Sequence, residues 1–373
     1  MPAQYKLILS SSAGIKQAEF TNFDWLTYTK RRNAPGSLKF RVDASHNAAQ
    51  YLTDKAQIEV YRRNLDVGLD WYSDFTGLVR DDVQEQSADG RDMLTCLCPG
   101  ALHMLEWRAI SWKAGTANRS SFTTAKGETM LKTLVQYNIT SSATTGNGRV
   151  ADGTMASPVS ISIQADAAGG NTIGSWGCAW RPLLEELQAI AKVAGGDFDL
   201  IKTGAATFEF RWYLGQRGAD YRTGASALKF SAKLGNMARP KLSRERTRVR
   251  TQVVVAGAGD SGGRETASRT GNGHSSSNVI EQFIDARNLA AGSNLNAEGD
   301  TRLAEYRLKE ELTFKVLQQP SCYYGKHYGV AGAIGDLINV EYRSYTAAHQ
   351  VNAVTVSWDD KGENVGVETQ VYG

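Results

Sequence analysis

The N-terminal part of the chain alternates apolar and polar residues with a period of two. The pattern is clearest in Gly36–Val42, Ala56–Arg62 and Phe75–Val79, and Gly, Pro, Asn and Asp residues separate the alternating runs. A period of two places apolar side chains on one face of a strand and polar side chains on the other. The pattern therefore predicts short strands from Tyr5 to about Leu105, arranged as a small barrel or sandwich.

Three segments further along the chain change to a helical period. Glu128–Asn138 and residues 182–194 each carry an apolar stripe, and Pro182 and Gly195 mark the start and the end of the second helix. A third helix is predicted from Asp300, a good N-cap residue, to about Leu312. These stripes are typical of helices that pack on a core.

Strand patterns return between and after the helices. The predicted strands are Phe198–Ile201, Ala206–Trp212, Val249–Val255, Leu337–Tyr342, Val351–Trp358 and Gly366–Val371. Residues 202–205 form a predicted hairpin turn between the first two strands. Residues 257–278 are rich in Gly, Ser, Arg and Asn without periodicity, which predicts a long loop or insertion.

Composition adds bounds on the class of protein. The 373 residues include 41% hydrophobic and 22% charged residues, as in ordinary globular proteins, and the net charge of +3 is too small to imply nucleic-acid binding. No apolar run approaches the roughly 18 residues that span a bilayer. The N-terminus lacks a signal-peptide pattern, so we expect a protein made and kept in a cytoplasm.

Two overlapping motifs in one loop resemble catalytic or cofactor sites. Gly257–Gly262 matches G-x-G-x-x-G, but no apolar-periodic helix follows to hold a pyrophosphate. Residues 259–263 resemble the nucleophile loop of trypsin-like serine proteases, with Ser261 as nucleophile and His349 as base. That family has His before Ser along the chain, whereas the order here is reversed. A solvated Gly-Ser turn is the favoured interpretation of Ser261.

Other reactive side chains do not converge. The adjacent carboxylates Asp81-Asp82, Glu185-Glu186 and Asp359-Asp360 are predicted to be solvated. Cys96 and Cys98 share one face of a strand and are predicted to be buried thiols, and five scattered histidines have no recognisable partners. We therefore expect no catalytic, cofactor-binding or metal-binding residues and no cofactor.

A basic run covers residues 239–250. As a strand it would project Arg244, Arg246, Arg248 and Arg250 from one face. Such a row is compatible with a solvated face, with contact to an acidic neighbouring subunit, or with phosphate binding.

The order of these segments resembles the central hub proteins at the tail tip or baseplate of long-tailed (siphophage or myophage type) bacteriophages. The resemblance lies in Gly36–Val42, the strand ending at Arg62, residues 180–199, residues 278–287 and the closing strands from Gly335. It covers most of the chain. Its motifs are single strands and turns whose order and spacing carry the likeness.

The resemblance implies an α+β, mainly β fold with two tail-tube-like β-barrels and inserted mixed α/β domains. The implied first barrel covers residues 1–110. A mixed α/β domain covers 111–205, with part of 257–324 packing on it. The second barrel combines 206–256 with 325–373, and 257–324 forms a loop and helix insertion.

The resemblance also implies a structural function and no enzyme activity. A homotrimeric hub would join the hexameric tail tube, or a distal tail protein, to distal tip, fibre or spike proteins. It would contact the tape-measure protein, form part of the DNA exit channel and touch phage DNA transiently. Because the chain ends after its last predicted strand, any lytic or piercing domain is expected in another protein.

Two alternatives to the hub stay open at this point. A tail-associated glycan- or receptor-binding protein would expose an aromatic cluster comprising Trp176, Trp180, Tyr323, Tyr324 and Tyr328. A serine hydrolase would bring Ser261 within hydrogen-bonding reach of His349 and an acid.

Overall fold

The chain divides into two compact units. The structure, a computed structural model, describes residues 3–111, 118–155, 159–259, 261–287 and 295–372, without the side chains of Ser261 and Ala331. Unit 1 comprises residues 1–240 and 313–373, and unit 2 comprises residues 241–312. None of the helices in the described ranges is long and apolar enough to cross a membrane.

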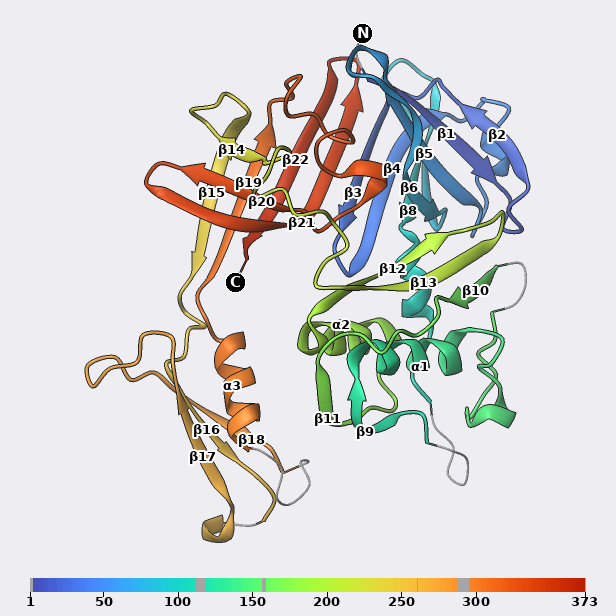
Figure 1. Cartoon of the computed structure of the whole chain (residues 1–373). Coiled ribbons are helices and arrows are strands. Elements are labelled where there is room, and N and C mark those ends of the chain that lie inside the picture. Colours follow the sequence, from blue (N-terminus) through green and yellow to red (C-terminus); the bar gives the residue numbers. More distant parts are fainter. Residues whose placement is uncertain (1–2, 112–117, 156–158, 260, 288–294, 373) are drawn as a thin grey trace. The chain divides into compact units, whose positions relative to one another are not determined.

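Unit 1 contains a ten-stranded sheet (Figure 1). Its main path runs β15-β19-β22-β21-β3-β4-β8-β7, and β14 and β20 join it through β21. The strands are β3 (Trp25–Arg31), β4 (Ala34–Asp43), β7 (Asp81–Gln86), β8 (Asp92–Pro99), β14 (Lys229–Ser231), β15 (Met237–Glu245), β19 (Lys309–Val316), β20 (Leu337–Tyr342), β21 (Tyr345–Asp359) and β22 (Gly362–Val371). The chain leaves unit 1 along β15 and returns along β19.

A four-stranded sheet packs face to face on the ten-stranded sheet. Its order is β2-β1-β5-β6, with β1 (Gln4–Ser10), β2 (Lys16–Phe20), β5 (Gln57–Asn64) and β6 (Leu69–Leu78). Aromatic pairs cross the interface, including Phe20 with Phe40 and Tyr28 with Phe75, whose ring centroids are 6.4 and 5.9 Å apart. The predicted alternation is confirmed here, since Leu38, Phe40 and Val42 are all buried.

The ten-stranded sheet differs from the predicted pair of separate barrels. Strands from the two predicted barrel segments pair directly, because β3 runs antiparallel to β21 with Tyr28 opposite Val356. No closed barrel forms among the described strands, so the mainly β fold class is confirmed and the two barrels stay a prediction. The four predicted domain boundaries also stay predictions. The sequence pattern predicted many of the strands but not their partners, because strand pairing depends on contacts far apart in the chain.

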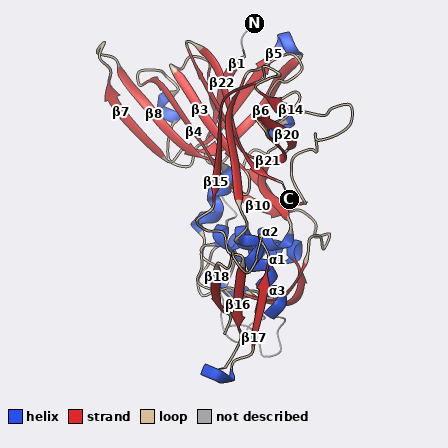
Figure 2. Ribbon diagram, turned by 90° about the vertical axis from the view of Figure 1, so that its left-hand side faces the viewer, coloured by secondary structure: helices blue, strands red, loops and turns tan. Residues whose placement is uncertain are grey.

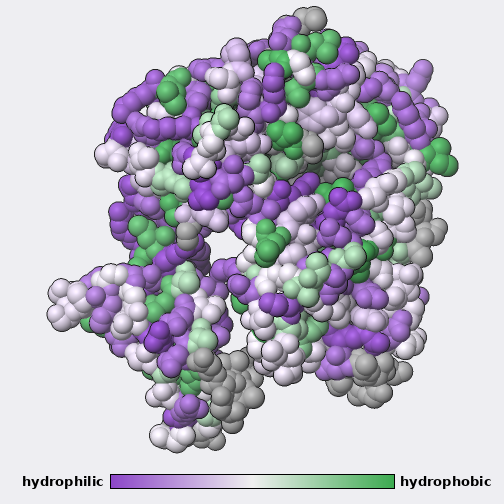
Figure 3. Space-filling model, in the orientation of Figure 1, coloured by the Kyte–Doolittle hydropathy of each residue, from purple (hydrophilic) through white to green (hydrophobic). Residues whose placement is uncertain are grey.

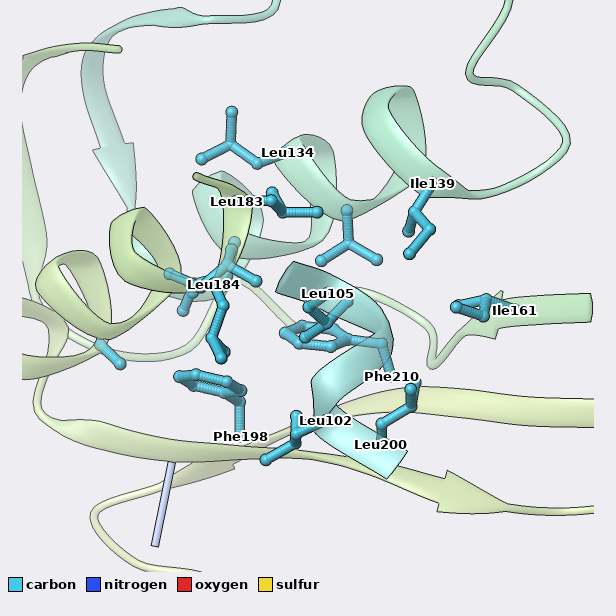
Figure 4. Packing of buried hydrophobic residues seen from close by; sticks show 14 of the residues in the cluster. Leu102, Leu105, Leu134, Ile139, Ile161, Leu183, Leu184, Phe198, Leu200 and Phe210 are labelled. Atoms are coloured by element: carbon cyan, nitrogen blue, oxygen red, sulfur yellow. The ribbon is translucent and has the colours of Figure 1, made fainter. Parts of the chain in front are cut away.

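The helical part of unit 1 packs on a second, smaller set of strands. The order β10-β13-β12 forms one sheet and β11-β9 another. The elements are β9 (Ser121–Lys126), α1 (Gly127–Ile139), β10 (Ser160–Ile163), β11 (Thr172–Gly177), α2 (Leu183–Ala194), β12 (Gly196–Lys202) and β13 (Thr207–Leu214). Figure 4 shows Leu184 of α2 lying over Phe198 of β12, and Leu134 of α1 and Leu105 of the 3-10 helix η3 (Ala101–Trp107) belong to the same buried cluster.

The first two predicted helices are confirmed. The apolar stripes of α1 and α2 are buried, and Pro182 precedes α2 as its N-cap. Gly195 ends α2 with φ of +71°, a backbone conformation that glycine adopts without strain. The predicted hairpin is also confirmed, because β12 and β13 pair antiparallel across residues 203–206.

Unit 2 is a three-stranded sheet covered by one helix. The order is β17-β16-β18, with β16 (Gln252–Ala256), β17 (Thr266–Thr270), β18 (Glu281–Asp285) and α3 (Leu295–Glu305). Its small core comprises Val253, Val255, Ala286, Leu295 and Leu303. The short 3-10 helices of the chain are η1 (Ala49–Tyr51), η2 (Leu65–Val67), η4 (Thr145–Asn147), η5 (Ser261–Gly263) and η6 (Val330–Gly332).

Two sequence predictions in this region are wrong. The third helix begins at Leu295 and ends at Glu305, so Asp300 lies inside it rather than at its N-cap, and Leu312 lies in β19. Leu312, Phe314 and Val316 are buried alternately, and pairing of β19 with β22 overrides the local helical pattern. The predicted loop 257–278 contains β17, which pairs antiparallel with β16.

Candidate assembly interface

The two ends of the ten-stranded sheet carry opposite charges. β7 is the last strand at one end, and all six of its residues are exposed (Figure 2). Asp81, Asp82 and Glu85 give it three acidic side chains and no basic one. An edge strand presents a row of unpaired backbone N–H and C=O groups, so β7 is an acidic surface that is able to pair with another strand.

β15 ends the sheet on the opposite side and is basic. It contains Arg239, Lys241 and Arg244 against the single acid Glu245. Arg239 and Lys241 are exposed, whereas Arg244 Nε donates a hydrogen bond to Glu310 Oε1 at 2.6 Å. The sheet therefore ends in an acidic edge and a basic edge.

A buried arginine holds the two large sheets of unit 1 together. The Arg62 side chain of β5 is completely buried, and its Nε and Nη2 donate to the two carboxylate oxygens of Glu363 at 2.7 and 2.8 Å. The same guanidinium donates to the hydroxyls of Tyr5 and Tyr72 and to the carbonyl oxygen of Tyr324. This bidentate contact joins β5 of one sheet to β22 of the other and fixes their relative position.

A second buried ion pair lies beside a cavity of about 470 Å³ in unit 1. Lys30 Nζ donates to Asp74 Oδ1 at 2.8 Å and to the Tyr324 hydroxyl at 2.9 Å. Burial lowers the pKa of Lys30, and the adjacent Asp74 carboxylate opposes this shift. Two further pairs line the cavity, Lys202 with Glu59 and Arg217 with Asp199. Within each of these pairs the two charges neutralise each other. The cavity is therefore a polar contact region between the two packed sheets and β12.

His349, the base of the serine-hydrolase alternative, lies in the core of unit 1. His349 is fully buried in β21, and its Nε2 and Nδ1 are hydrogen bonded to the hydroxyls of Tyr345 and Thr369 at 2.8 and 2.7 Å. A catalytic histidine needs a carboxylate to orient it and access to the nucleophile. Ser261 belongs to unit 2, and its side chain lies outside the described residues.

The G-x-G-x-x-G segment is the loop of a β-hairpin. It connects β16 with the antiparallel β17, and Arg264 Nε and Nη2 donate to the carbonyl oxygens of Gly257 and Ala256 at 2.9 and 2.6 Å. Gly259 has φ of +109°, as the tight turn requires. Asp260 lies outside the described residues. Because β17 follows the three-residue η5, rather than an α-helix, this loop lacks the helix N-terminus that binds a pyrophosphate.

The adjacent carboxylates and the cysteines are placed mostly as predicted. Asp81 and Asp82 are exposed. Glu186 corrects the prediction of a solvated pair, because it is buried and accepts a hydrogen bond from Trp176 Nε1 at 2.6 Å. Cys96 and Cys98 are buried free thiols, and burial raises the pKa of Cys96 to about 12. Such thiols are unreactive packing groups at neutral pH.

The predicted aromatic binding surface does not form. Tyr324 and Tyr328 are fully buried, and Tyr323 is 8% exposed. The Tyr324 hydroxyl donates to Asp74 Oδ1 at 3.0 Å, so this ring belongs to the buried polar network. Trp180 is exposed, but it lacks the tyrosines as neighbours on a common surface. The aromatic residues proposed for glycan binding therefore do not form an exposed cluster, and this alternative is wrong for those residues.

The predicted row of four arginines is also wrong. β15 ends at Glu245, so Arg246, Arg248 and Arg250 do not continue the strand. Arg250 instead donates to the carbonyl oxygens of Thr247 and Val249 and lies over the ring of Tyr306. The surviving basic feature is the edge strand itself.

Sequence reasoning missed Arg62 and Glu363 as a pair. The alternation contains a signal, because Arg62 follows Ile58 and Val60 at every second position and so falls on the apolar face of its strand. Glu363 precedes Val365 and Val367 in the same way. A charged residue on the buried face of a strand predicts a buried partner. The partner lies 301 residues away, and only the folded chain identifies it.

Several solved protein structures are similar in fold to this chain. Solved structures similar in fold include the 43 kDa tail protein of prophage MuSo2 from Shewanella oneidensis, at 12% identity over 98% of both chains with a TM-score of 0.62. The tail protein from Neisseria meningitidis MC58 matches at 10% identity over 98% of this chain and 96% of that chain, with a TM-score of 0.61. No curated protein sequence matches the chain significantly.

A third similar structure is a chain of the half-lidded Francisella PdpA-VgrG complex. It matches all of this chain and 58% of its own length at 7% identity, with a TM-score of 0.55. These likenesses establish the fold of the chain. The model of the siphovirus ReqiPepy6 Gp37-like protein family matches residues 11–369. The chain therefore belongs to the siphovirus ReqiPepy6 Gp37-like family and has the fold of phage tail proteins.

Proposed function

We propose that this tail protein is the subunit of a homotrimeric hub at the tail tip or baseplate. The observation that carries the proposal is the acidic edge β7 and the basic edge β15 on one ten-stranded sheet. Opposite edges attract each other and like edges repel, which favours head-to-tail contact between copies over self-pairing of one edge. Head-to-tail contacts form a closed ring when the rotation between subunits closes.

The ring would use β7 of one copy and β15 of the next. Arg239 and Lys241 share one face of β15, so one of the adjacent carboxylates Asp81 and Asp82 would lie on their side of the new strand pair, in addition to the backbone hydrogen bonds. The edges specify the head-to-tail contact. The number of three subunits per ring comes from the resemblance to phage hub proteins, and a measurement of the particle mass in solution tests it.

In this function the ring joins the hexameric tail tube or a distal tail protein to distal tip, fibre or spike proteins. The tape-measure protein ends at the ring, and the lumen forms part of the DNA exit channel. The polar face of the ten-stranded sheet suits such a wall, because Thr27, Lys39 and Thr355 project from it while their neighbours Leu26, Phe40 and Val356 are buried. Transient contact with DNA would involve this face.

The test is a charge exchange between the two edges. We expect the wild-type chain to have three times the subunit mass in solution and to form rings in electron micrographs. Asp81→Lys with Asp82→Lys, or Arg239→Glu with Lys241→Glu, should each abolish the trimer, because each makes the two edges alike. The four substitutions together should restore it, because the contact is again between opposite charges.

Controls separate this effect from a general change in charge. Glu185→Lys with Asp360→Lys adds the same charge at exposed positions of α2 and the β21–β22 turn, and should leave the trimer intact. A wild-type chain that stays monomeric and never associates with tail tubes would refute the hub. Failure of the fourfold variant to recover would refute the pairing of β7 with β15.

A further inference from the structure

Lys30 and Asp74 meet between the two packed sheets of unit 1. Lys30 belongs to β3 of the ten-stranded sheet, and Asp74 belongs to β6 of the four-stranded sheet. Hydrophilic residues cover much of the face of the molecule in Figure 3, whereas these two side chains are only 9% and 0% exposed. Lys30 Nζ lies 2.8 Å from Asp74 Oδ1, and the carboxyl carbon is the next atom beyond that oxygen. This arrangement holds a nucleophile against an acyl carbon in a site with little water.

Irregular strand pairing positions both residues. Asp74 lies between Ser73 and Phe75, which pair with adjacent residues of β5, so Asp74 is the extra residue of a β-bulge. The register between β3 and β4 also shifts at Lys30. A bulge redirects a side chain and is common next to active sites. The two irregularities meet at one buried pair, and together they bring the amine and the carboxyl group into contact.

Two buried tyrosine hydroxyls hold the carboxyl group of Asp74. The Tyr28 hydroxyl donates to Oδ2 at 2.5 Å, and the Tyr324 hydroxyl donates to Oδ1 at 3.0 Å. Burial raises the pKa of both hydroxyls well above their usual 10, so both remain donors at neutral pH. Burial also lowers the pKa of the Lys30 ammonium, which favours the neutral amine. Donors at both oxygens stabilise the negative charge that develops there when the carbon is attacked.

We propose that Lys30 and Asp74 form an isopeptide bond that links the two sheets covalently. A proton first passes from the ammonium to the carboxylate, because a buried site favours the neutral amine and acid. The lone pair of Nζ then attacks Cγ and forms the C–N bond. The bond from Cγ to one oxygen breaks, and that oxygen leaves as water with the carboxyl proton and one proton from Nζ. One ammonium and one carboxylate thus give one amide and one water, without any further reactant.

The surroundings of the pair suit this reaction. Both residues line the cavity of about 470 Å³ described above, so the departing water has a polar space to enter. The bond would close a covalent loop between residues 30 and 74 and would keep the two sheets joined even in the unfolded chain. It does not require the trimer, whose mass is measured under native conditions.

Mass spectrometry of the purified, denatured chain tests the proposal. The wild-type chain should be lighter by one water molecule than the mass calculated for its sequence and its actual N-terminus. A tryptic digest should contain residues 17–31 joined to residues 64–80, because trypsin does not cleave after a linked Lys30. A wild-type chain of full mass, or a water loss located elsewhere in the chain, would overturn the proposal.

Three variants give a second readout. Lys30→Met removes the nucleophile, leaves Asp74 with its two hydroxyl donors, and should restore the full mass. Lys202→Met is the matched control, because Lys202 pairs with Glu59 in the same cavity but both side chains keep about 15% exposure, which favours their ionised forms. It should retain the loss of one water.

Tyr28→Phe removes the donor to Oδ2 and should slow formation of the bond by about a hundredfold, measured as the linked fraction at fixed times after synthesis. Linking at the wild-type rate in Tyr28→Phe, or loss of one water in Lys30→Met, would contradict the proposal. The linked peptide of the wild-type chain is measured without any variant, so the test does not depend on how the variants fold.

Discussion

Replacing Glu363 with alanine would leave the buried Arg62 guanidinium without its carboxylate partner. Both carboxylate oxygens of Glu363 accept hydrogen bonds from Arg62, and the Arg62 side chain has no exposed surface. Burying a charge without its partner is unfavourable because the lost hydration is not replaced. We therefore expect Glu363→Ala to destabilise unit 1 by about 3–5 kcal/mol.

Thermal unfolding measures this loss. At about 2 °C per kcal/mol for a large domain, the unfolding midpoint of unit 1 should fall by about 6–10 °C. Glu368→Ala is the matched control on the same strand, because Glu368 pairs with Arg31 at 3.7 Å and both side chains are about half exposed. An exposed pair contributes about 0–1 kcal/mol, so the control should shift the midpoint by about 2 °C or less.

A double variant distinguishes loss of the ion pair from loss of packing. Arg62→Met with Glu363→Leu replaces both charges by apolar groups of similar size, and such replacements of buried ion pairs are often neutral. It should be more stable than Glu363→Ala, because it leaves no buried charge without a partner, although the Tyr324 carbonyl oxygen also loses its Arg62 donor. A midpoint for Glu363→Ala within about 1 °C of wild type, or a double variant less stable than the single one, would refute the reasoning.

Three further predictions concern other parts of unit 1. Gly127→Ala should destabilise the protein by about 1–3 kcal/mol in thermal unfolding, because the new Cβ would lie 3.2 Å from Ala194 Cα and closer still to its Cβ, whereas Gly174→Ala has open space and should be neutral. Burial raises the pKa of Cys178 and of Cys322 to about 12, so a thiol reagent at pH 8 should label no cysteine of the native chain and all four after unfolding; fast labelling of the native chain would contradict this. Hydrogen bonds and ion pairs from Lys229 and Lys233 lower the pKa of Glu341 from 4.5 to about 2, so its stabilising contribution is present above pH 4.5 and is lost as the pH falls toward 2. Glu341→Gln should flatten that part of the stability profile, and an unchanged acid dependence would exclude this carboxylate as its source.

Local signals in the sequence determined most of the elements. The stripe of α2, with Pro182 before it and Gly195 after it, predicted the helix because capping and periodicity act within a few residues. The alternation of Leu38, Phe40 and Val42 predicted a half-buried strand for the same reason. The absence of convergent catalytic side chains and the order of the segments together indicated a phage tail protein, which the family match confirmed.

The tertiary structure decided which strands meet and which charges are buried. Lys309–Val316 became a strand against its helical pattern, because pairing within the ten-stranded sheet buries Leu312, Phe314 and Val316. Arg62 met Glu363 across 301 residues, and the acidic β7 and basic β15 became the two ends of one sheet. Pairing between distant segments depends on the closure of long loops and on the packing of two faces at once. A linear pattern contains neither, so the candidate interface emerges only in the folded chain.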